Sequence, residues 1–218
     1  MTNAISDIFI GIDMGSTGLK AVAFEAGTGA TLATAGDALP HARLPGGGCE
    51  IAGSAIRSAL VQALRSVSQQ LGPRVAAVRA LGCTGHGAGL YALDARAELL
   101  RDRAIASTDQ RAAGRARALA QQHGPALFED VGCQPWAGQP TLIAAELFAA
   151  DAALHASMRH LSFAKDYLAF LLTGELATDA SDASTAGLLS LATGRWSTLA
   201  FEAARLADLA PGMLPPLV

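Results

Sequence analysis

Short apolar runs separated by glycine-rich turns dominate the beginning of the chain. Ile8–Met14 is one such run, residues 19–25 alternate in part between apolar and polar positions, and the turn at residues 15–18 separates the two. Two short apolar segments joined by a tight turn are typical of a β-hairpin. We therefore predict a hairpin here, with residues 31–36 as a third antiparallel strand.

Residues 40–53 are rich in proline and glycine, and we predict a loop there. Beyond it the apolar residues recur every three or four positions, which is the period of one face of an α-helix. These positions are Ile56, Leu60, Leu64, Val67 and Leu71. They predict one amphipathic helix, which Gly72 and Pro73 end.

The remaining chain mixes short strands with helices. Apolar runs predict strands at residues 75–83, 90–94 and 103–106, with a glycine-rich bend at residues 85–89. Helical patterns follow at residues 112–122, 142–149, 164–173 and 199–209, with loops at residues 134–140 and 173–186. Strands that alternate with helices in this way indicate an α/β fold.

The composition is that of a chain with a substantial hydrophobic core. Hydrophobic residues make up 51% of its 218 residues, and the mean hydropathy is +0.31, which excludes disorder for most of it. A net charge of −3 with scattered basic residues argues against nucleic acid as the main partner. The apolar runs are interrupted before the roughly 18 residues that a membrane-spanning helix needs, which argues against a membrane.

The N-terminus and the cysteines bear on location. The start MTNAISDIFIGID has no basic segment followed by a long apolar one, as a secretory signal would. Cys49, Cys83 and Cys133 are odd in number, and no pair has the CxxC spacing of a zinc site. We expect a soluble protein of the reducing cytoplasm and assign the cysteines no chemistry.

The turn of the predicted hairpin carries residues suited to a nucleotide phosphate. Asp13 stands at the end of a strand, Gly15 allows a close approach of backbone N–H groups, Ser16 and Thr17 add hydroxyl donors, and Lys20 adds a positive charge. Asp13 is also suited to hold a magnesium ion through water. The segment lacks the GxxxxGK[ST] pattern, so an ordinary hairpin turn without a ligand stays open as the alternative.

Further segments follow that hairpin in a specific order. They are the bend GCTGHGAGLY at residues 82–91, STDQR at 107–111, AKDYL at 164–168, LTGE at 172–175 and TDASDAS at 178–184. Together with the hairpin, this set resembles the N-terminal half of the FGGY carbohydrate kinases from Ile8 to about Pro216. Within that family GHGAGLY, STDQR and the QPWAGQP loop at residues 134–140 are most similar to bacterial L-xylulose kinases and xylulokinase-like sugar kinases.

The resemblance implies an actin-like ATPase domain with a ribonuclease H-like core, that is, a mixed five-stranded sheet flanked by helices. It implies that residues 1–218 are the sugar-binding N-terminal domain and that a second, nucleotide-binding domain lies beyond residue 218. The implied reaction is ATP-dependent phosphorylation of a sugar hydroxyl, most simply that of a pentulose such as L-xylulose or D-xylulose. The general base is expected beyond residue 218, so we expect the chain alone to be inactive.

The resemblance also implies roles for individual residues. Asp13 would lie near the magnesium ion and the transferring phosphate, and Gly15, Ser16, Thr17 and Lys20 would belong to the phosphate-binding hairpin. His86 and Asp109 fall on positions that contact sugar hydroxyls, with Gly87 in the same bend. A homodimer is an assembly that the resemblance allows.

The residues themselves leave several alternatives open. A bend at a strand end suits His86 for binding a polyol, but a lone histidine is more often an ordinary surface or core residue. Asp109 is equally a helix N-cap. Trp136 either packs against a sugar face or fills the edge of a core. Lys165 and Asp166 are most simply an exposed lysine and an acidic residue in the first turn of a helix.

One segment departs from the family. The helix after Gln139 and Pro140 usually carries a lysine and a tryptophan, and residues 142–148 contain neither. Two other functions remain open: a non-catalytic actin-like domain for sugar binding or dimerisation, and another actin-like ATPase. The presence of Asp13, Thr17 and His86 together with Asp109 argues against the first, and the GHG and DxxDxS segments argue against the second.

Overall fold

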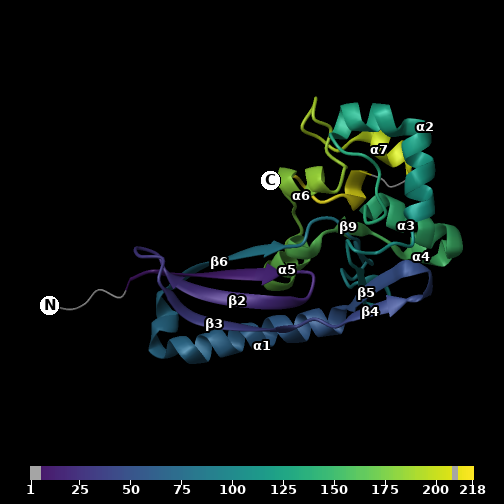
Figure 1. Ribbon diagram of the computed structural model, residues 1–218. Coiled ribbons are helices and arrows are strands. Elements are labelled where there is room, and N and C mark those ends of the chain that lie inside the picture. Colours follow the sequence, from purple (N-terminus) through teal and green to yellow (C-terminus); the bar gives the residue numbers. More distant parts are fainter. Residues whose placement is uncertain (1–5, 208–210) are drawn as a thin grey trace. The chain divides into compact units, whose positions relative to one another are not determined.

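The computed structural model describes residues 6–207 and 211–218, which fold as two compact units. The first unit consists of the chain up to Pro40 together with Ser54–His86. The second consists of His41–Gly53 and Gly87–Val218. The β-sheets of the described residues are formed within the units and not across them. Figure 1 labels several of their strands.

The first unit is built on a four-stranded sheet. Its strands are β1 (Ile8–Met14), β2 (Gly18–Glu25), β3 (Thr31–Ala38) and β6 (Val78–Gly85), in the order β3-β2-β1-β6. β1 pairs antiparallel with β2 and parallel with β6. The predicted hairpin, the third antiparallel strand and the strand after the helix are confirmed.

Alternation along β1 explains why this segment is a central strand. Ile8, Ile10, Ile12 and Met14 are at most 5% exposed, and Asp13 between the last two is exposed. Side chains of a strand point alternately to its two faces, so one face of β1 is apolar and the other carries Asp13.

The predicted amphipathic helix is α1 (Gly53–Leu71), which runs beside the sheet (Figure 1). The side-chain amide of Gln70 donates to the carbonyl of Thr34 at 3.0 Å and accepts from its N–H at 3.2 Å. Thr34 lies on the edge strand β3, whose outer backbone groups would otherwise lack partners. A 3₁₀ segment at Gly72–Ala77 then leads into β6.

The second unit has two small sheets. One contains β4 (His41–Leu44), β5 (Gly48–Ala52) and β8 (Arg103–Ile105), and the other pairs β7 (Tyr91–Leu93) with β9 (His160–Ser162). The expectation of a single five-stranded sheet is therefore wrong, and so is the prediction of a loop over residues 40–53. Gly46 and Gly47 have φ values of 77° and 86°, so the glycine cluster forms the turn between β4 and β5.

Helices supply most of the core of the second unit. They are α2 (Ala113–Val131), α3 (Pro140–Ala150), α4 (Ala152–Ser157), α5 (Ala164–Thr173), α6 (Ala180–Thr185) and α7 (Thr198–Ala203). Shorter 3₁₀ turns lie at Pro45–Gly47, Leu100–Asp102 and Pro211–Met213. The bounds of α5 agree with the prediction, whereas α4, α6 and β9 were not predicted. The predicted helix at residues 199–209 ends at Ala203, and residues 208–210 lie outside the described ranges.

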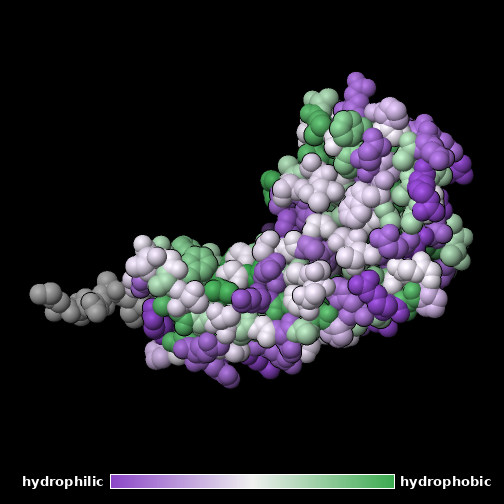
Figure 2. Space-filling view, viewed as in Figure 1, coloured by the Kyte–Doolittle hydropathy of each residue, from purple (hydrophilic) through white to green (hydrophobic). Residues whose placement is uncertain are grey.

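Helix α2 is longer than predicted because it continues through Pro125. Leu127 and Val131, beyond the proline, are buried in the core, and this burial offsets the backbone hydrogen bond that proline cannot donate. Gly132, with φ 73°, ends the helix in the left-handed conformation. Hydrophilic residues cover much of the outer side of α2 in Figure 2. Arg117 and Gln121 of this helix are exposed.

Among residues 6–207 and 211–218, no helix is both long enough and apolar enough to cross a bilayer.

Candidate functional site

The β1–β2 hairpin has a tight turn with two hydroxyl side chains at its tip. Met14 pairs with Leu19, and the N–H of Gly15 donates to the carbonyl of Gly18 at 3.0 Å, which leaves Ser16 and Thr17 as the loop. Both are exposed. The backbone of the turn is fixed by the strand pairing, while its hydroxyl groups face solvent.

Asp13 and Lys20 are direct partners in the register of this hairpin. Directly paired residues of antiparallel strands project from the same face, so a carboxylate and an ammonium group stand side by side there. On the other side of Asp13, its parallel partner on β6 is Thr84. Asp13 and Lys20 are both exposed. This face therefore presents one negative and one positive group beside the hydroxyls of the turn.

His86 follows β6 directly and is attached to the same end of the sheet. Its N–H donates to the carbonyl of Met14, the last residue of β1, at 2.9 Å. The side chain is half-buried. The first unit thus brings together Asp13, the hairpin turn and His86.

Three loops of the second unit meet through close backbone contacts. The N–H of Gly89 donates to the carbonyl of Gly138 at 3.0 Å. A Cβ atom on Gly89 would lie 2.6 Å from the carbonyl oxygen of Ile105, and one on Gly138 would lie 2.0 Å from that of Ser107. Only glycine fits at such approaches. The bend after His86, the STDQR segment and the Trp136 loop therefore form one packed group.

Trp136 belongs to this group and is half-buried. A Cβ atom on Gly138 would lie 2.3 Å from Cζ3 of Trp136, so the indole ring lies against its own loop. The side-chain oxygen of the buried Gln139 accepts from the N–H of Trp136 at 3.3 Å. The ring has one packed side and some exposed surface.

Asp109 is fully buried, with 0% of its surface exposed. Its carboxylate accepts from the N–H of Cys49 at 2.6 Å and from the N–H of Arg111 at 2.9 Å. The Nε of Arg111 also donates to both carboxylate oxygens, at 3.0 and 2.9 Å. A sugar hydroxyl would have to displace one of these donors to reach Asp109. The N-cap alternative is wrong, because α2 begins at Ala113 and its N-cap residue is Ala112.

Arg111 extends this network to Glu50 on β5, whose Oε1 lies 2.8 Å from Nη2 of Arg111. Burial alone would lower the pKa of Arg111, but the hydrogen bond that Arg111 donates to Glu50 and the charge of Asp109 raise it. Sequence reasoning missed Glu50 because it lies in the stretch predicted to be a loop. The alternation of apolar residues around Cys49 and Ile51 was the available signal.

Lys165 and Asp166 lie in the first turn of α5, as predicted, but the lysine is not exposed. Its side chain is 17% exposed, and Nζ contacts Oδ1 of Asp166 at 2.5 Å, Oδ2 of Asp179 at 3.2 Å and Oδ2 of Asp182 at 3.4 Å. The reason is α6, an unpredicted helix that places Asp179 and Asp182 against α5.

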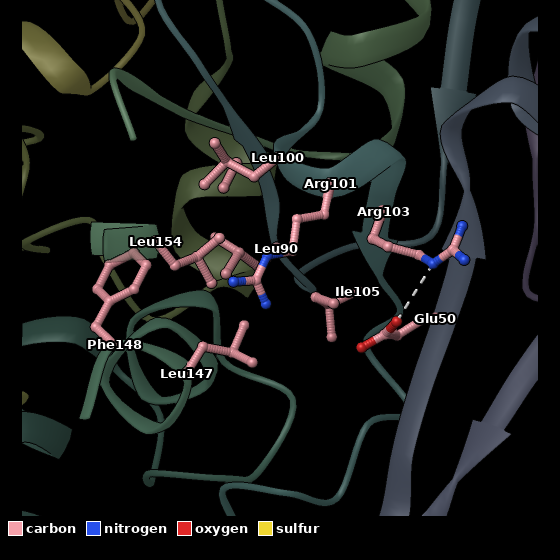
Figure 3. A pocket seen from close by; sticks show the side chains of 10 residues that line it. Glu50, Leu90, Leu100, Arg101, Arg103, Ile105, Leu147, Phe148 and Leu154 are labelled. Carbon is pink, nitrogen blue, oxygen red and sulfur yellow. Dashed lines mark ion pairs between the residues drawn. The ribbon is translucent and has the colours of Figure 1, made fainter. Parts of the chain in front are cut away.

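A separate cavity of about 300 Å³ lies within the second unit (Figure 3). Its wall is largely apolar and includes Leu90, Leu147 and Phe148. Arg103 is turned towards Glu50, with 3.6 Å between Nε and Oε2. None of the site residues predicted from the sequence lines this cavity.

The comparisons with known proteins cover the whole chain. Residues 8–218 match the N-terminal domain of the FGGY family of carbohydrate kinases. The xylulose kinase of Streptomyces coelicolor is 32% identical over 224 residues, which is 100% of this chain and 44% of that protein. The xylulose kinase of Streptomyces rubiginosus is 30% identical over the same coverage.

Solved structures agree on the fold. A "xyloylose kinase" from Brucella ovis matches 97% of this chain with a TM-score of 0.86 and 26% identity, over 42% of its own length. Xylulose kinase from Lactobacillus acidophilus matches with a TM-score of 0.87 and 21% identity, again over 97% of this chain and 42% of its own length. This chain thus spans less than half the length of these relatives. Because the family match extends over nearly all of its residues, the chain belongs to the FGGY family of carbohydrate kinases, within the family's N-terminal domain.

Proposed function

We propose that the protein containing this chain transfers the terminal phosphoryl group of ATP to a hydroxyl group of a pentulose such as L-xylulose or D-xylulose. The observation that carries the proposal is the position of Asp13, at the end of a central strand and beside a turn with two exposed hydroxyls, in a chain that matches the FGGY family. The identities of about 30% to xylulose kinases support the substrate class.

In this proposal the hairpin binds phosphate. The hydroxyls of Ser16 and Thr17 donate hydrogen bonds to phosphoryl oxygens, Gly15 keeps the turn free of a further side chain, and the ammonium group of Lys20 balances the phosphate charge. Because the turn is fixed by its strand pairing, these donors need little reorganisation when a phosphate arrives.

Asp13 fits a magnesium site of the kind used in phosphoryl transfer. Mg²⁺ is commonly bound by one or two carboxylates together with waters and substrate phosphates, and Asp13 is a single exposed carboxylate beside the hairpin. The ion would supply neutralisation of the charge that develops on the phosphoryl oxygens. No group of three or more acidic, histidine or cysteine side chains suited to a metal occurs among residues 6–207 and 211–218.

His86, Gly87 and Trp136 are proposed as residues that contact the sugar. An imidazole offers directional hydrogen bonds to hydroxyls, and an indole offers an apolar surface to the C–H groups of a sugar. The buried Asp109 acts in this proposal through Arg111 and Cys49, since its own oxygens are occupied. It shapes the wall of the site and does not bind the sugar directly.

The chain is proposed to act as the sugar-binding half of a larger enzyme. It spans 44% of its curated relatives, so more than half of a kinase of that length has no counterpart here. We assign the general base and most of the adenine site to that remainder. The 218-residue chain alone is therefore expected to phosphorylate no sugar.

The test measures ADP release by the full-length protein with ATP, Mg²⁺ and a panel of L-xylulose, D-xylulose, L-ribulose, sugar alcohols and glycerol. Asp13→Asn is the test variant. Asp7→Asn is the matched control, since Asp7 precedes the same strand at its opposite end and pairs with Arg79.

A pentulose-dependent signal that Asp13→Asn abolishes and Asp7→Asn retains supports the proposal. ATP hydrolysis that no sugar stimulates indicates another actin-like ATPase. The absence of both activities indicates a non-catalytic domain. Either of the last two results overturns the proposal.

A further inference from the structure

A buried group of charges lies directly against the bend that follows His86. Lys165 of α5 is surrounded by Asp166, Asp179 and Asp182, with distances from Nζ of 2.5, 3.2 and 3.4 Å. Asp166 is 3% and Asp182 is 6% exposed. One ammonium group therefore faces three carboxylates, two of them nearly removed from water, and cannot neutralise them all.

The three carboxylates respond differently to this imbalance. Burial raises the pKa of Asp182 to about 6, although Lys165 acts in the opposite direction. Burial likewise raises the pKa of Asp166. For Asp179 the effect of burial is outweighed by hydrogen bonds from Ser181, Asp182 and Lys165, and its pKa falls to about 2. Asp182 is thus the member of the group that exchanges a proton closest to neutral pH.

Tyr91 on β7 is a further ionisable group that interacts with Asp182. Burial, together with Tyr167 and Asp182, raises the pKa of Tyr91, so that its hydroxyl stays neutral. The charge state of this region near neutral pH therefore depends on Asp182 and on the Lys165 group that holds it.

Asp182 reaches the bend through its unbonded oxygen. Its Oδ1 is buried and has no hydrogen-bond partner among the described residues. A Cβ atom on Gly87 would lie 3.7 Å from this oxygen. The backbone N–H of Ala88, which follows Gly87 in the chain, lowers the pKa of Asp182.

The bend is held in an unusual conformation at this point. Ala88 has φ 57° and the following Gly89 has φ 76°. The left-handed region is unfavourable for alanine, and such conformations persist only where their surroundings enforce them. Asp182 and Thr185 of α6 lie against this bend. A Cβ atom on Gly87 would lie 2.7 Å from Cγ2 of Thr185.

We propose that Asp182, held by Lys165, is a positioning residue that fixes the bend at residues 87–89 and thereby the hydroxyl-binding geometry of the sugar site. The effect on the bend stands on contacts within the second unit alone, and the effect on the sugar rests on the function proposed above. The charged carboxylate attracts the N–H of Ala88 and stays anchored to Lys165. Protonation weakens both interactions and loosens the bend.

The experiment follows amide hydrogen exchange at residues 88–90 of this chain from about pH 5 to about pH 8, with rates corrected for intrinsic exchange. The N–H of Gly89, which is bonded to Gly138, reports directly on opening of the bend. Opening of the bend alone removes the contact of Asp182 with the N–H of Ala88, which lowers the pKa, and leaves Asp182 buried. The wild-type chain is therefore expected to lose protection of the bend as the pH falls through about 6. Asp182→Asn is expected to exchange at least about fivefold faster at neutral pH and to lose the pH dependence.

Asp179→Asn is the matched control, because it removes another carboxylate from Lys165 but not the one beside Gly87. Asparagine also keeps the capping role of residue 179 at α6. Lys165→Arg retains the positive charge and is expected to preserve protection of the bend. Equal protection in the wild type and Asp182→Asn at every pH overturns the proposal, and the pH titration of the wild type tests it even if a variant fails to fold.

A second experiment measures the kinetics of sugar phosphorylation. In the full-length protein, Asp182→Asn is expected to raise KM for the sugar about tenfold while kcat changes little. A fall in kcat with unchanged KM contradicts a positioning role. If the wild-type protein phosphorylates no sugar, the proposed function fails, but the exchange experiment still decides whether Asp182 holds the bend.

Discussion

The carboxylate of Asp109 accepts hydrogen bonds from both the backbone N–H and the Nε of Arg111, two residues further along the chain. Arg111 in turn reaches Glu50 on β5, and Asp109 itself accepts the N–H of Cys49. A short segment between β8 and α2 is thereby fastened to a strand that lies about sixty residues earlier in the sequence. The network stabilises the loop at residues 107–111.

Removing Asp109 is predicted to destabilise the chain strongly. Asp109→Ala leaves Arg111 without its buried partner and the N–H of Cys49 without an acceptor, so the free energy of unfolding should fall by about 3 kcal/mol. Urea unfolding followed by circular dichroism measures this. The exposed Asp37 is the control, and Asp37→Ala should change stability by less than about 0.5 kcal/mol. Equal stability of the two variants would contradict the role assigned to Asp109.

Glycine at position 87 is predicted to be required by Thr185. A Cβ atom there would lie 2.7 Å from Cγ2 of Thr185, so Gly87→Ala should cost about 1 to 3 kcal/mol. Thr185→Ala removes that methyl group and should recover much of the loss. The measurement is a double-mutant cycle on the free energy of unfolding, with a coupling of at least about 1 kcal/mol expected between the two positions. Additive effects would show that the strain has another source.

The free energy of unfolding is predicted to change with pH because Asp182 gains or loses a proton. Its pKa is raised to about 6 in the folded chain, so the folded state binds more protons than the unfolded state between the ordinary value and about 6. Stability contributed through this group is therefore lost as the pH rises through that window. The free energy of unfolding of Asp182→Asn, relative to that of the wild type, should rise by about 1 to 3 kcal/mol between about pH 4 and about pH 7.

Thermal unfolding of both proteins across that range measures the difference. Asp182→Asn is thus predicted to gain global stability relative to the wild type as the pH rises, while it loosens the bend locally, as expected where strain is stored at a site. A difference in Tm that stays constant with pH would contradict the raised pKa.

Lys20 is predicted to act in nucleotide binding and not in folding. It is exposed, and its removal leaves the strand pairing of the hairpin in place. In the full-length protein Lys20→Ala should raise KM for ATP about tenfold, the loss expected for one charge-assisted hydrogen bond. The midpoint of urea unfolding should be unchanged. An unchanged KM for ATP would show that Lys20 does not contribute to phosphate binding.

Local patterns were sufficient to predict the elements whose burial follows a regular period. The hairpin, α1 and α5 each have a clear alternation or helical spacing, and the structure confirms all three. β4 and β5 were missed because each has only four or five residues and is flanked by glycine and proline. Their stability comes from pairing with one another and with β8, which no local pattern encodes.

The candidate site was predictable to a similar extent. The order of the motifs identified the hairpin and the bend, and the structure places His86 beside the end of β1. The sequence did not reveal that Asp109 is occupied by Arg111, or that Lys165 is drawn into a buried group by Asp182. Both facts depend on contacts between elements distant in the sequence, so spacing alone could not predict them.

Phosphoryl transfer to a sugar, with Asp13 at the phosphate, is tested most directly by following the transferred group. The full-length protein is incubated with a pentulose and with ATP labelled in its terminal phosphoryl group, and the label is then located. We expect label in a sugar phosphate, formed at a rate at least about a hundredfold lower in Asp13→Asn. Label recovered only as inorganic phosphate, or an equal yield of sugar phosphate from Asp13→Asn, would contradict this expectation.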